Sequence, residues 1–493
     1  MTGAAVSAGR APGLAPVLAL LAVGAATAYA ALAMGHPAAT AAPVVLAALA
    51  WAAARAPLRA SAGALALLVL ALDDLETANG LWHSPLAGLG DIVHHSMQSI
   101  FPAAQGIPLT GTEIAIFFLL GVAAWRSARR GRAPGVSMPP RATLAVGAAY
   151  LGAVGFAIAN GLARGGSPEV AVWQTRPLVE TAALFLVFAA ALRGGAGDAR
   201  LGALVVAAAL VRAVLAAWVR WVVVPRTGFP LEYATNHGDS MLFTIAALLV
   251  VAYALERRDR RVATALLVLP ALLVGIQANT RRTAWLQLAL GLVVFLVVAR
   301  GAAWRRQAGR AALLALPLLV LYGVAGWSSD AAAYRPVQLV RSVTDSTVDR
   351  STWDRQVENW NLAMSMRDRP LVGRGFGHEW TELFAGDEIT RIFHRYKTQP
   401  HNQILGLLLF AGPLGFVAIW APLALLVLAG ARAYPRARTP EERATALCVA
   451  ATAIVVGIQC FSDLGPFWPQ YAVLTALALA AAGKLATATG VAR

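Results

Sequence analysis

The chain has little charge for its length. Charged residues make up 13% of its 493 residues and hydrophobic residues 58%, with a mean hydropathy of +0.62. Because soluble domains carry about 25% charged residues, this balance excludes an ordinary soluble domain and predicts an integral membrane protein. Lysine is almost absent: only Lys397 and Lys484 occur, so nearly all of the basic charge is arginine.

Cysteine is also scarce, and no metal-ligand pattern accompanies it. The two cysteines, Cys448 and Cys460, fall on one predicted helix. At a rise of 1.5 Å per residue they would lie roughly 18 Å apart, which is too far for a disulfide. The acidic and histidine residues between Asp73 and His95 follow no spacing typical of metal ligands. We therefore predict neither a disulfide nor a metal site.

The basic charge lies mostly between apolar runs. A formal net charge of +16 would fit a nucleic-acid-binding protein, but most of the arginines lie in short connecting segments. That pattern is typical of membrane topology and contact with lipid headgroups. We expect membrane lipids as partners, and no nucleic acid.

Apolar segments long enough to approach a membrane span recur along the whole chain. We place fourteen, near residues 14–34, 39–54, 61–80, 111–126, 142–161, 176–193, 200–222, 237–255, 262–278, 283–299, 311–327, 402–430, 443–461 and 466–487. Several are shorter than the ~20 residues that a span needs, so we expect an all-α polytopic membrane protein with about 12–14 spans. The run after Arg10 is interpreted as a retained first span, with a cleaved signal peptide as the alternative.

Arginine clusters predict the topology. They fall in every second connection, at 55–59, 126–141, 193–200, 257–261, 300–310 and 432–438. The positive-inside rule assigns these connections to the cytoplasm. Both termini are then cytoplasmic and the long segment 328–401 lies outside. The expected organisation is a bundle over 1–327 (about eleven spans), an outer loop over 328–401 and about three more spans over 402–493.

Some arginines break this rule by facing outside. They are Arg164, Arg176, Arg220, Arg226, Arg281 and Arg282. For any one of them, snorkelling to headgroups is the simpler interpretation. The doublet Arg281-Arg282 is different, because it lies in a hairpin of a few residues between two spans. Two guanidiniums at such a turn favour a phosphate or pyrophosphate, which arginine binds bidentately.

The outer loop 328–401 contains ten basic and ten acidic residues, which predicts a folded segment instead of a polybasic tail. Within it, the segment Thr352–Met366 predicts an amphipathic helix. Its apolar residues at helical spacing are Trp353, Val357, Trp360 and Met364. The glycine-rich stretch 373–377 follows no strand and precedes no long apolar helix, which excludes a dinucleotide site.

The loop re-enters the membrane at Pro400-His401-Asn402-Gln403. Because an imidazole exchanges protons near neutral pH, His401 at the mouth of a membrane helix is a candidate general base. The alternative is a helix start with an incidental histidine.

Together these stretches resemble the O-antigen ligase and O-antigen polymerase family. Trp360-x-x-Ala363, the run from Pro370 to Gly377, and 400–403 look like the family's outer-loop signature. The family's histidine motif is matched by His401, Asn402, Gly412 and Gly415. The likeness covers about residues 200–430.

Two further stretches resemble that family in the expected order. Arg226-Thr227-Gly228-Phe229 followed by Asn236-His237 is similar to a glycine-phenylalanine-asparagine segment, and 280–285 is similar to a serine-arginine-glycine-alanine stretch with Arg282 at its arginine. The chain departs from the family at Gln356, where an arginine is usual, so either Arg350 or Arg355 takes that role.

The resemblance implies a GT-C-like glycosyltransferase of the bacterial inner membrane that inverts the anomeric centre without metal or cofactor. Its donor would be a glycan on undecaprenyl pyrophosphate, and its acceptor a sugar hydroxyl on a glycan or on lipid A-core. His401 would be the base and Arg282 would stabilise the leaving pyrophosphate. The implied substrate-binding residues are Arg281, Arg350, Arg355, Asn402, Arg226, Asn236, His378 and His394.

Other function classes stay open at this point. A polysaccharide flippase or other transporter would show an internal repeat between its halves, and we see none. A peptidoglycan polymerase of the shape and division type would depend on an outer-loop carboxylate among residues 345–388. Within the family, a polymerase, a ligase and a protein O-oligosaccharyltransferase are not separated by the sequence, nor is the oligomeric state.

Overall fold

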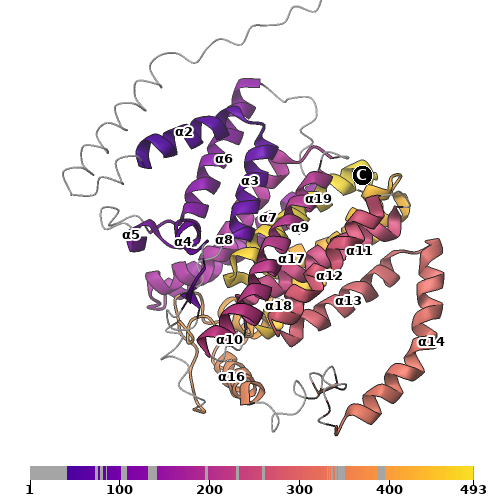
Figure 1. Cartoon of the computed structure of the whole chain (residues 1–493). Coiled ribbons are helices and arrows are strands. Elements are labelled where there is room, and N and C mark those ends of the chain that lie inside the picture. The colour runs from indigo at the N-terminus through magenta and orange to yellow at the C-terminus, as the bar shows by residue number, and fades with distance from the viewer. Residues whose placement is uncertain are drawn as a thin grey trace, which may run out of the picture.

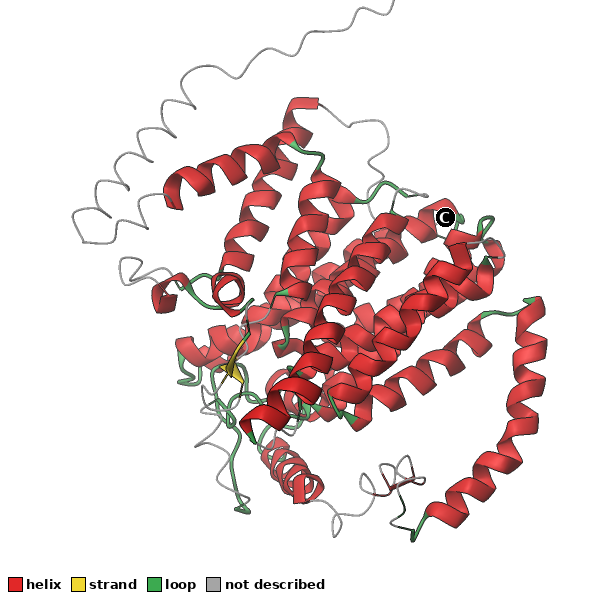
Figure 2. Cartoon of the chain, viewed as in Figure 1, coloured by secondary structure: helices red, strands yellow, loops and turns green. Residues whose placement is uncertain are grey.

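The computed structural model of the protein describes residues 42–72, 76–77, 82–84, 86–100, 108–130, 141–194, 198–228, 233–257, 261–329, 331, 334, 337–338, 341, 350–385 and 395–491. This part of the chain is an all-α polytopic membrane protein (Figures 1 and 2). Its described strands are β1 (Glu76–Thr77) and β2 (Trp82–His83), which form a small antiparallel hairpin.

Thirteen of the fourteen predicted apolar segments overlap helices, and the first, 14–34, lies outside the described residues. The predicted segment 61–80 is wrong at its end, because its helix ends at Ala71 and residues 76–77 form a strand. These helices are α2 (Ala42–Arg55), α3 (Leu58–Ala71), α6 (Gly111–Arg130), α7 (Arg141–Leu162), α8 (Pro168–Ala191), α9 (Ala199–Trp218), α11 (His237–Glu256), α12 (Arg261–Ala278), α13 (Arg282–Val298), α14 (Ala303–Gly326), α17 (Gln403–Ala433), α18 (Pro440–Ser462) and α19 (Pro469–Ala488). Shorter helices are α4 (Ala87–His94), α5 (Met97–Ile100), α10 (Val224–Thr227) and α16 (Arg350–Met366), with π-helical η3 (Val219–Val223) and 3-10 turns η6 (Tyr434–Arg436) and η7 (Gly465–Phe467).

Eight helices in the described residues are long and apolar enough to cross a membrane. They are α6, α7, α9 with its continuation through α10, α11, α14, α17, α18 and α19. Helices α3 and α13 are apolar but have only 14 and 17 residues, and the apolar part of α12 is similarly short. The described part is therefore a multi-pass membrane protein, with fewer full-length spans than the 12–14 that we predicted.

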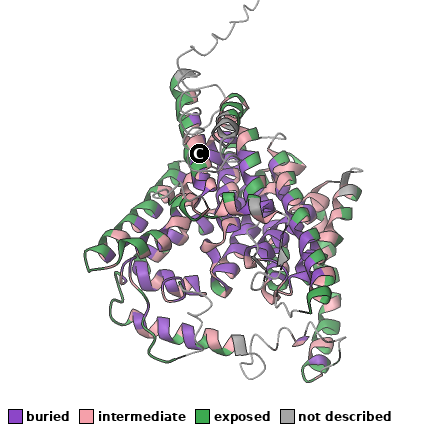
Figure 3. Cartoon of the chain, turned by 60° about the vertical axis from the view of Figure 1, so that its left-hand side comes forward, coloured by how far each residue is buried: buried purple, intermediate pink, exposed green. Residues whose placement is uncertain are grey.

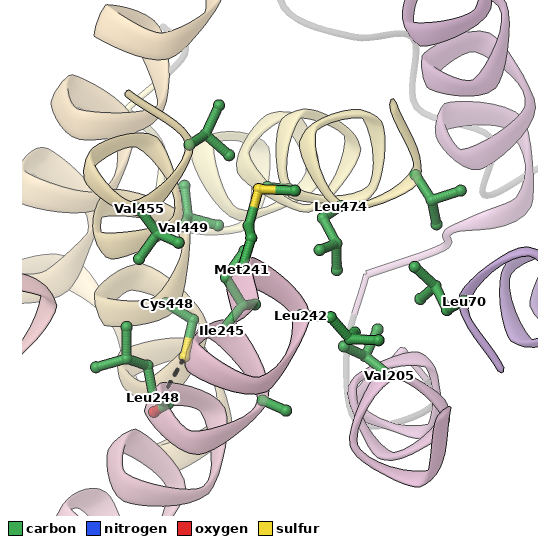
Figure 4. Close-up of a cluster of buried hydrophobic side chains, with 14 of the residues drawn as sticks. Leu70, Val205, Met241, Leu242, Ile245, Leu248, Cys448, Val449, Val455 and Leu474 are labelled. Atoms are coloured by element: carbon green, nitrogen blue, oxygen red, sulfur yellow. Dashed lines mark hydrogen bonds between the residues drawn. The ribbon is translucent and has the colours of Figure 1, made fainter. Parts of the chain in front are cut away.

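The core lies where α11, α18 and α19 pack together, and most of the side chains of these three helices are buried (Figure 3). In Figure 4, Met241, Leu242 and Leu248 of α11 face residues of α18, α19 and α9. Many of the buried residues in α18 and α19 are alanines, and small side chains let membrane helices approach closely. The cysteines Cys448 and Cys460 are both free and buried on α18, as predicted.

Helix α14 contrasts with this core. It lies at the edge of the bundle in Figure 1, and none of its spanning window is buried. Its leucines, among them Leu314 at 76% and Leu318 at 69% exposure, face away from the rest of the described protein. In a membrane this side of α14 meets lipid, which satisfies apolar side chains without protein packing.

Helix α17 is broken near its start, and the glycine-rich loop 373–377 binds to its backbone at the break. Gly412 has φ 66° and ψ 174° inside the helix, and Pro413 has no N–H to donate to the carbonyl of Leu409. That carbonyl accepts instead from the N–H of Arg374 at 2.8 Å, and the carbonyl of Phe410 accepts from the N–H of Gly375 at 2.9 Å. The loop therefore completes the hydrogen bonds that the broken helix lacks.

Glycines in this loop are needed for close backbone contact. A Cβ on Gly375, whose φ is +87°, would lie 2.2 Å from the backbone nitrogen of Gly161 at the end of α7. A Cβ on Gly373 would lie 2.5 Å from the nitrogen of Gly412. The run 373–377 thus packs α16, α7 and α17 together, which explains its glycines without any bound phosphate.

Helix α16 forms as predicted, and its predicted apolar residues are divided between two faces. Val357 is 8% exposed and faces the bundle, whereas Trp353 and Trp360 are 47% and 48% exposed and do not pack on the core. The face toward the bundle contains Glu358, Asn361 and Leu362, each at most 1% exposed. The Asn361 amide explains this orientation, because it hydrogen-bonds the backbone of residues 383 and 384 at 2.8–3.0 Å.

Candidate functional site

The candidate site lies at the end of the bundle where α11, α13 and α17 begin. Helix α16 and the short helix α10 lie at this end, at the bottom of Figure 1. Helix caps define several of these starts: the Asn402 side chain caps α17 by accepting from the N–H of Leu405, and Asn236 caps α11 by accepting from the N–H of Asp239. The predicted residues His401, Arg281 and Arg282 all belong to this end.

His401 is held by a buried carboxylate. Its Nδ1 lies 2.8 Å from Oε2 of Glu358, whose side chain is 2% exposed, while the His401 side chain is 20% exposed. Because an ionised carboxylate only accepts hydrogen bonds, Nδ1 carries the proton and Nε2 keeps a lone pair. In the neutral ring, Nε2 is then the nitrogen that can accept a proton.

Glu358 is itself fixed from two further sides. The backbone N–H of Asn402 donates to its Oε1 at 3.1 Å, and the hydroxyl of Tyr396 hydrogen-bonds the same carboxylate. Burial, together with the negative charge of Glu358, raises the pKa of the Tyr396 phenol, so that hydroxyl stays protonated and donates. Asn402 also donates to Oδ1 of Asn359 at 2.9 Å, so its amide positions the turn.

A second histidine–carboxylate pair faces the same region. His237, the first residue of α11, pairs through Nδ1 with Asp463, which is 3% exposed and follows α18. The His237 ring lies 4.5 Å from the ring of Tyr233 and 5.3 Å from that of Trp468. Sequence reasoning named His237 only as part of a motif, and Asp463 carried no signal that could have predicted this pair.

Two arginines and a second histidine act electrostatically on His237. They are Arg281, Arg355 and His401. The guanidinium of Arg281 lies 4.1 Å from the centre of the Tyr233 ring, a cation–π contact. The structure therefore brings together three predicted residues that are widely separated in the sequence, around a histidine that lies near all of them.

The turn between α12 and α13 holds the arginine doublet in a constrained backbone. Thr280 has φ +54°, a left-handed conformation that is uncommon for a non-glycine residue. Arg281 is the N-cap residue of α13 and Arg282 is its first helical residue. The N-terminus of a helix is the positive end of its dipole, so the doublet belongs to a turn where an anion is favoured.

A buried polar network supports this turn from inside the bundle. Arg212 and Asp239 are both fully buried, and Nε of Arg212 donates to Oδ2 of Asp239 at 2.9 Å. Gln470 donates to the other Asp239 oxygen at 3.1 Å. Asn279 donates to the carbonyl of Asn236 at 3.1 Å, which links the turn to α11. Asn236 is thus used as a cap and a network member.

Breaking this ion pair should destabilise the whole site. We expect Asp239→Ala to lower the free energy of unfolding by about 3–5 kcal/mol, because it leaves the Arg212 charge buried without its carboxylate. Equilibrium unfolding of the purified protein in mixed micelles measures this. Asp91→Ala, which removes a half-exposed carboxylate on α4, is the control and should change little. Equal stability of the two variants would contradict the prediction.

The remaining predicted residues are placed as follows. His378 lies in the glycine-rich loop, where Nε2 is 3.2 Å from the carbonyl of Gly161, and nothing brings it to His401. Arg226 is exposed on α10. Arg350 begins α16, but its side chain is outside the described part, and so is the whole of His394. Arg355 is therefore the described member of the Arg350/Arg355 alternative, and it lies near His237.

Glu358 is the functional candidate that sequence reasoning missed. It is one of ten acidic residues in the outer loop, and it lies 43 residues before His401. The sequence nevertheless contained a signal. Glu358, Asn361 and Ser365 are three polar residues at helical spacing, so they lie on one side of the predicted helix. Periodicity methods that score only apolar residues pass over such a face.

Compared with protein-family models and with curated proteins, the chain has no significant match.

Proposed function

We propose that the protein is a membrane glycosyltransferase of the O-antigen ligase and polymerase type. The donor is a glycan on undecaprenyl pyrophosphate and the acceptor is a sugar hydroxyl, on a second lipid-linked glycan or on lipid A-core. The proposal includes the bacterial inner membrane as location, with residues 328–401 in the periplasm and both termini in the cytoplasm.

The observation that carries the proposal is the pairing of His401 with Glu358 near a group of arginines. A sugar hydroxyl is a weak nucleophile and needs a base within hydrogen-bond reach. Nε2 of His401 is suited to this task, because its Nδ1–H is held by Glu358 at 2.8 Å. The carboxylate orients the ring and stabilises the positive charge that forms when the imidazole takes the proton.

The leaving group determines the role of the arginines. When the bond from the anomeric carbon to the pyrophosphate oxygen breaks, the electron pair stays on that oxygen and negative charge develops there. Fixed guanidiniums stabilise such charge without reorganisation. We assign this to Arg282, supported by Arg281 and Arg355, which both lie near His237. The new bond forms from the acceptor oxygen on the opposite face, so the anomeric configuration inverts.

A reconstitution tests the proposal. Purified protein is incubated with an undecaprenyl pyrophosphate-linked oligosaccharide, with or without lipid A-core, and the products are separated on a gel. A ladder without lipid A-core would indicate a polymerase, and one shifted band that requires lipid A-core would indicate a ligase. Absence of any product, with a donor that a known transferase accepts, would overturn the proposal in favour of a transporter.

A further inference from the structure

A cavity beside α8 combines charged, amide and aromatic side chains outside the His401 cluster. Its volume is about 180 Å³. It is lined by residues of α4, of the start of α6 and of α8, by the segment before α17 and by the turn between α18 and α19. The side chains that matter for the argument are Trp173, Arg176, Glu180, Arg395, Gln399 and Phe467.

Charges of both signs meet at this cavity. Nε of Arg176 donates to Oε1 of Glu113 at 2.7 Å and lies 3.5 Å from a carboxylate oxygen of Glu180. The second guanidinium, that of Arg395, lies 4.2 Å from the centre of the Trp173 ring. Arg176 is therefore already engaged by two carboxyl groups, one in the lining and one behind it. This differs from the turn at Arg281-Arg282, where two cations are adjacent.

Helix α8 is continuously apolar after these residues, from Ala182 to Ala191. Charged side chains on such a helix usually face the bundle interior or a water-filled cavity, because exposure to lipid is costly. Arg176 and Glu180 are 27% and 20% exposed, and both line the cavity. Their accessible atoms therefore face a polar space and not the surrounding lipid.

The cavity and the His401 cluster share two walls. In the segment before α17, Arg395 and Gln399 line the cavity, while the Tyr396 ring lies 5.7 Å from the His401 ring. In the turn between α18 and α19, Phe467 lines the cavity, while Asp463 pairs with His237. A ligand in the cavity would therefore be separated from the proposed base by one or two short segments of chain.

We propose that this cavity binds one uncharged sugar ring of the acceptor glycan. Carboxylate, guanidinium and amide groups offer paired hydrogen bonds to neighbouring hydroxyls, and Trp173 and Phe467 offer flat apolar surfaces to the C–H face of a pyranose. The carboxyl groups that engage Arg176 disfavour a phosphate or a carboxylate there. The assignment of this sugar to the acceptor rests on the proposed function, because the acceptor is the second substrate of that reaction.

Sugar binding without donor tests the cavity by itself. Glucose, galactose and N-acetylglucosamine are titrated at millimolar concentrations into the purified full chain, with saturation-transfer NMR as the readout. We expect at least one sugar to bind saturably, and Glu180→Gln and Trp173→Ala to weaken it about tenfold through lost hydrogen bonds and ring contact. Trp51→Ala, an exposed tryptophan on α2, is the matched control and should bind as wild type. Inorganic pyrophosphate should not compete.

Several results would overturn this inference. They are no binding of any of the three sugars, equal binding by all variants, or competition by pyrophosphate, which would make the cavity an anion site. Gel filtration and thermal unfolding check that the variants are folded. Arg395→Gln is a third variant, and it replaces an exposed side chain, so it does not disturb the packed interior.

Transfer assays separate this inference from the proposed function. If transfer requires His401 but the cavity variants change neither the acceptor KM nor sugar binding, the cavity assignment fails alone. If the variants lose sugar binding but no transfer is ever detected, the proposed function fails and the sugar site stands.

Discussion

Replacing His401 by alanine is expected to lower the rate of glycan transfer about 10²–10⁴-fold, which is the usual contribution of a general base. The acceptor hydroxyl would then have to lose its proton to water. Donor binding should change little, because the arginines stay in place. Initial rates at saturating donor, measured in the reconstituted assay, give the ratio directly.

The control for this variant is His95→Ala. His95 lies at the end of α4, where it is half-exposed beside Asp91. It should transfer at the wild-type rate. If His401→Ala also kept that rate, His401 would not be the base, and His237 with its partner Asp463 would be the next candidate.

Glu358→Gln and His401→Ala together separate two mechanisms that both place a carboxylate in the outer loop. If Glu358 positions His401, Glu358→Gln should lower the rate by as much as about 10⁴-fold, because the amide can donate to Nδ1 and hold the ring in the wrong tautomer, and His401→Ala should cost a similar amount. If the carboxylate is itself the catalytic base, as the peptidoglycan polymerase alternative requires, Glu358→Gln should remove most of the rate while His401→Ala keeps most of it. The size of the His401→Ala loss decides between them.

Replacing Arg282 by alanine is the second large effect, expected to lower kcat about 10²–10³-fold through loss of one group that stabilises charge in the transition state. Arg282→Lys should recover part of the rate, since it restores a positive charge but not the bidentate guanidinium. Arg200→Ala, at the exposed start of α9, is the control for a lost surface arginine.

Arg281 offers a comparison within the same turn. Its guanidinium lies on the Tyr233 ring, so Arg281→Ala should loosen the turn and raise the donor KM more than it lowers kcat. Should Arg281→Ala reduce kcat as strongly as we expect for Arg282→Ala, while Arg282→Ala has little effect, the two assignments would be exchanged.

The class of protein and most of its helices follow from the sequence alone. Long apolar segments, separated by arginines, can only satisfy their backbone groups in lipid as helices, and thirteen predicted segments overlap helices in the structure. The residue at which α17 begins could also be predicted from the sequence. Asn402 is a good N-cap residue, and the apolar run begins directly after it, so His401 had to lie at the entrance of that helix.

What the tertiary structure decided is how residues far apart along the chain meet. Hydropathy is a local property, so it located α16 but could not show that its buried side holds Glu358, whose partner His401 lies 43 residues later. Apolar periodicity also could not show that Val357 is buried while Trp353 and Trp360 are exposed. The Arg212–Asp239 pair and the glycine contacts at Gly412 depend in the same way on helix packing. Such contacts form only when specific helices approach at a specific depth and rotation, and no window of sequence contains that information.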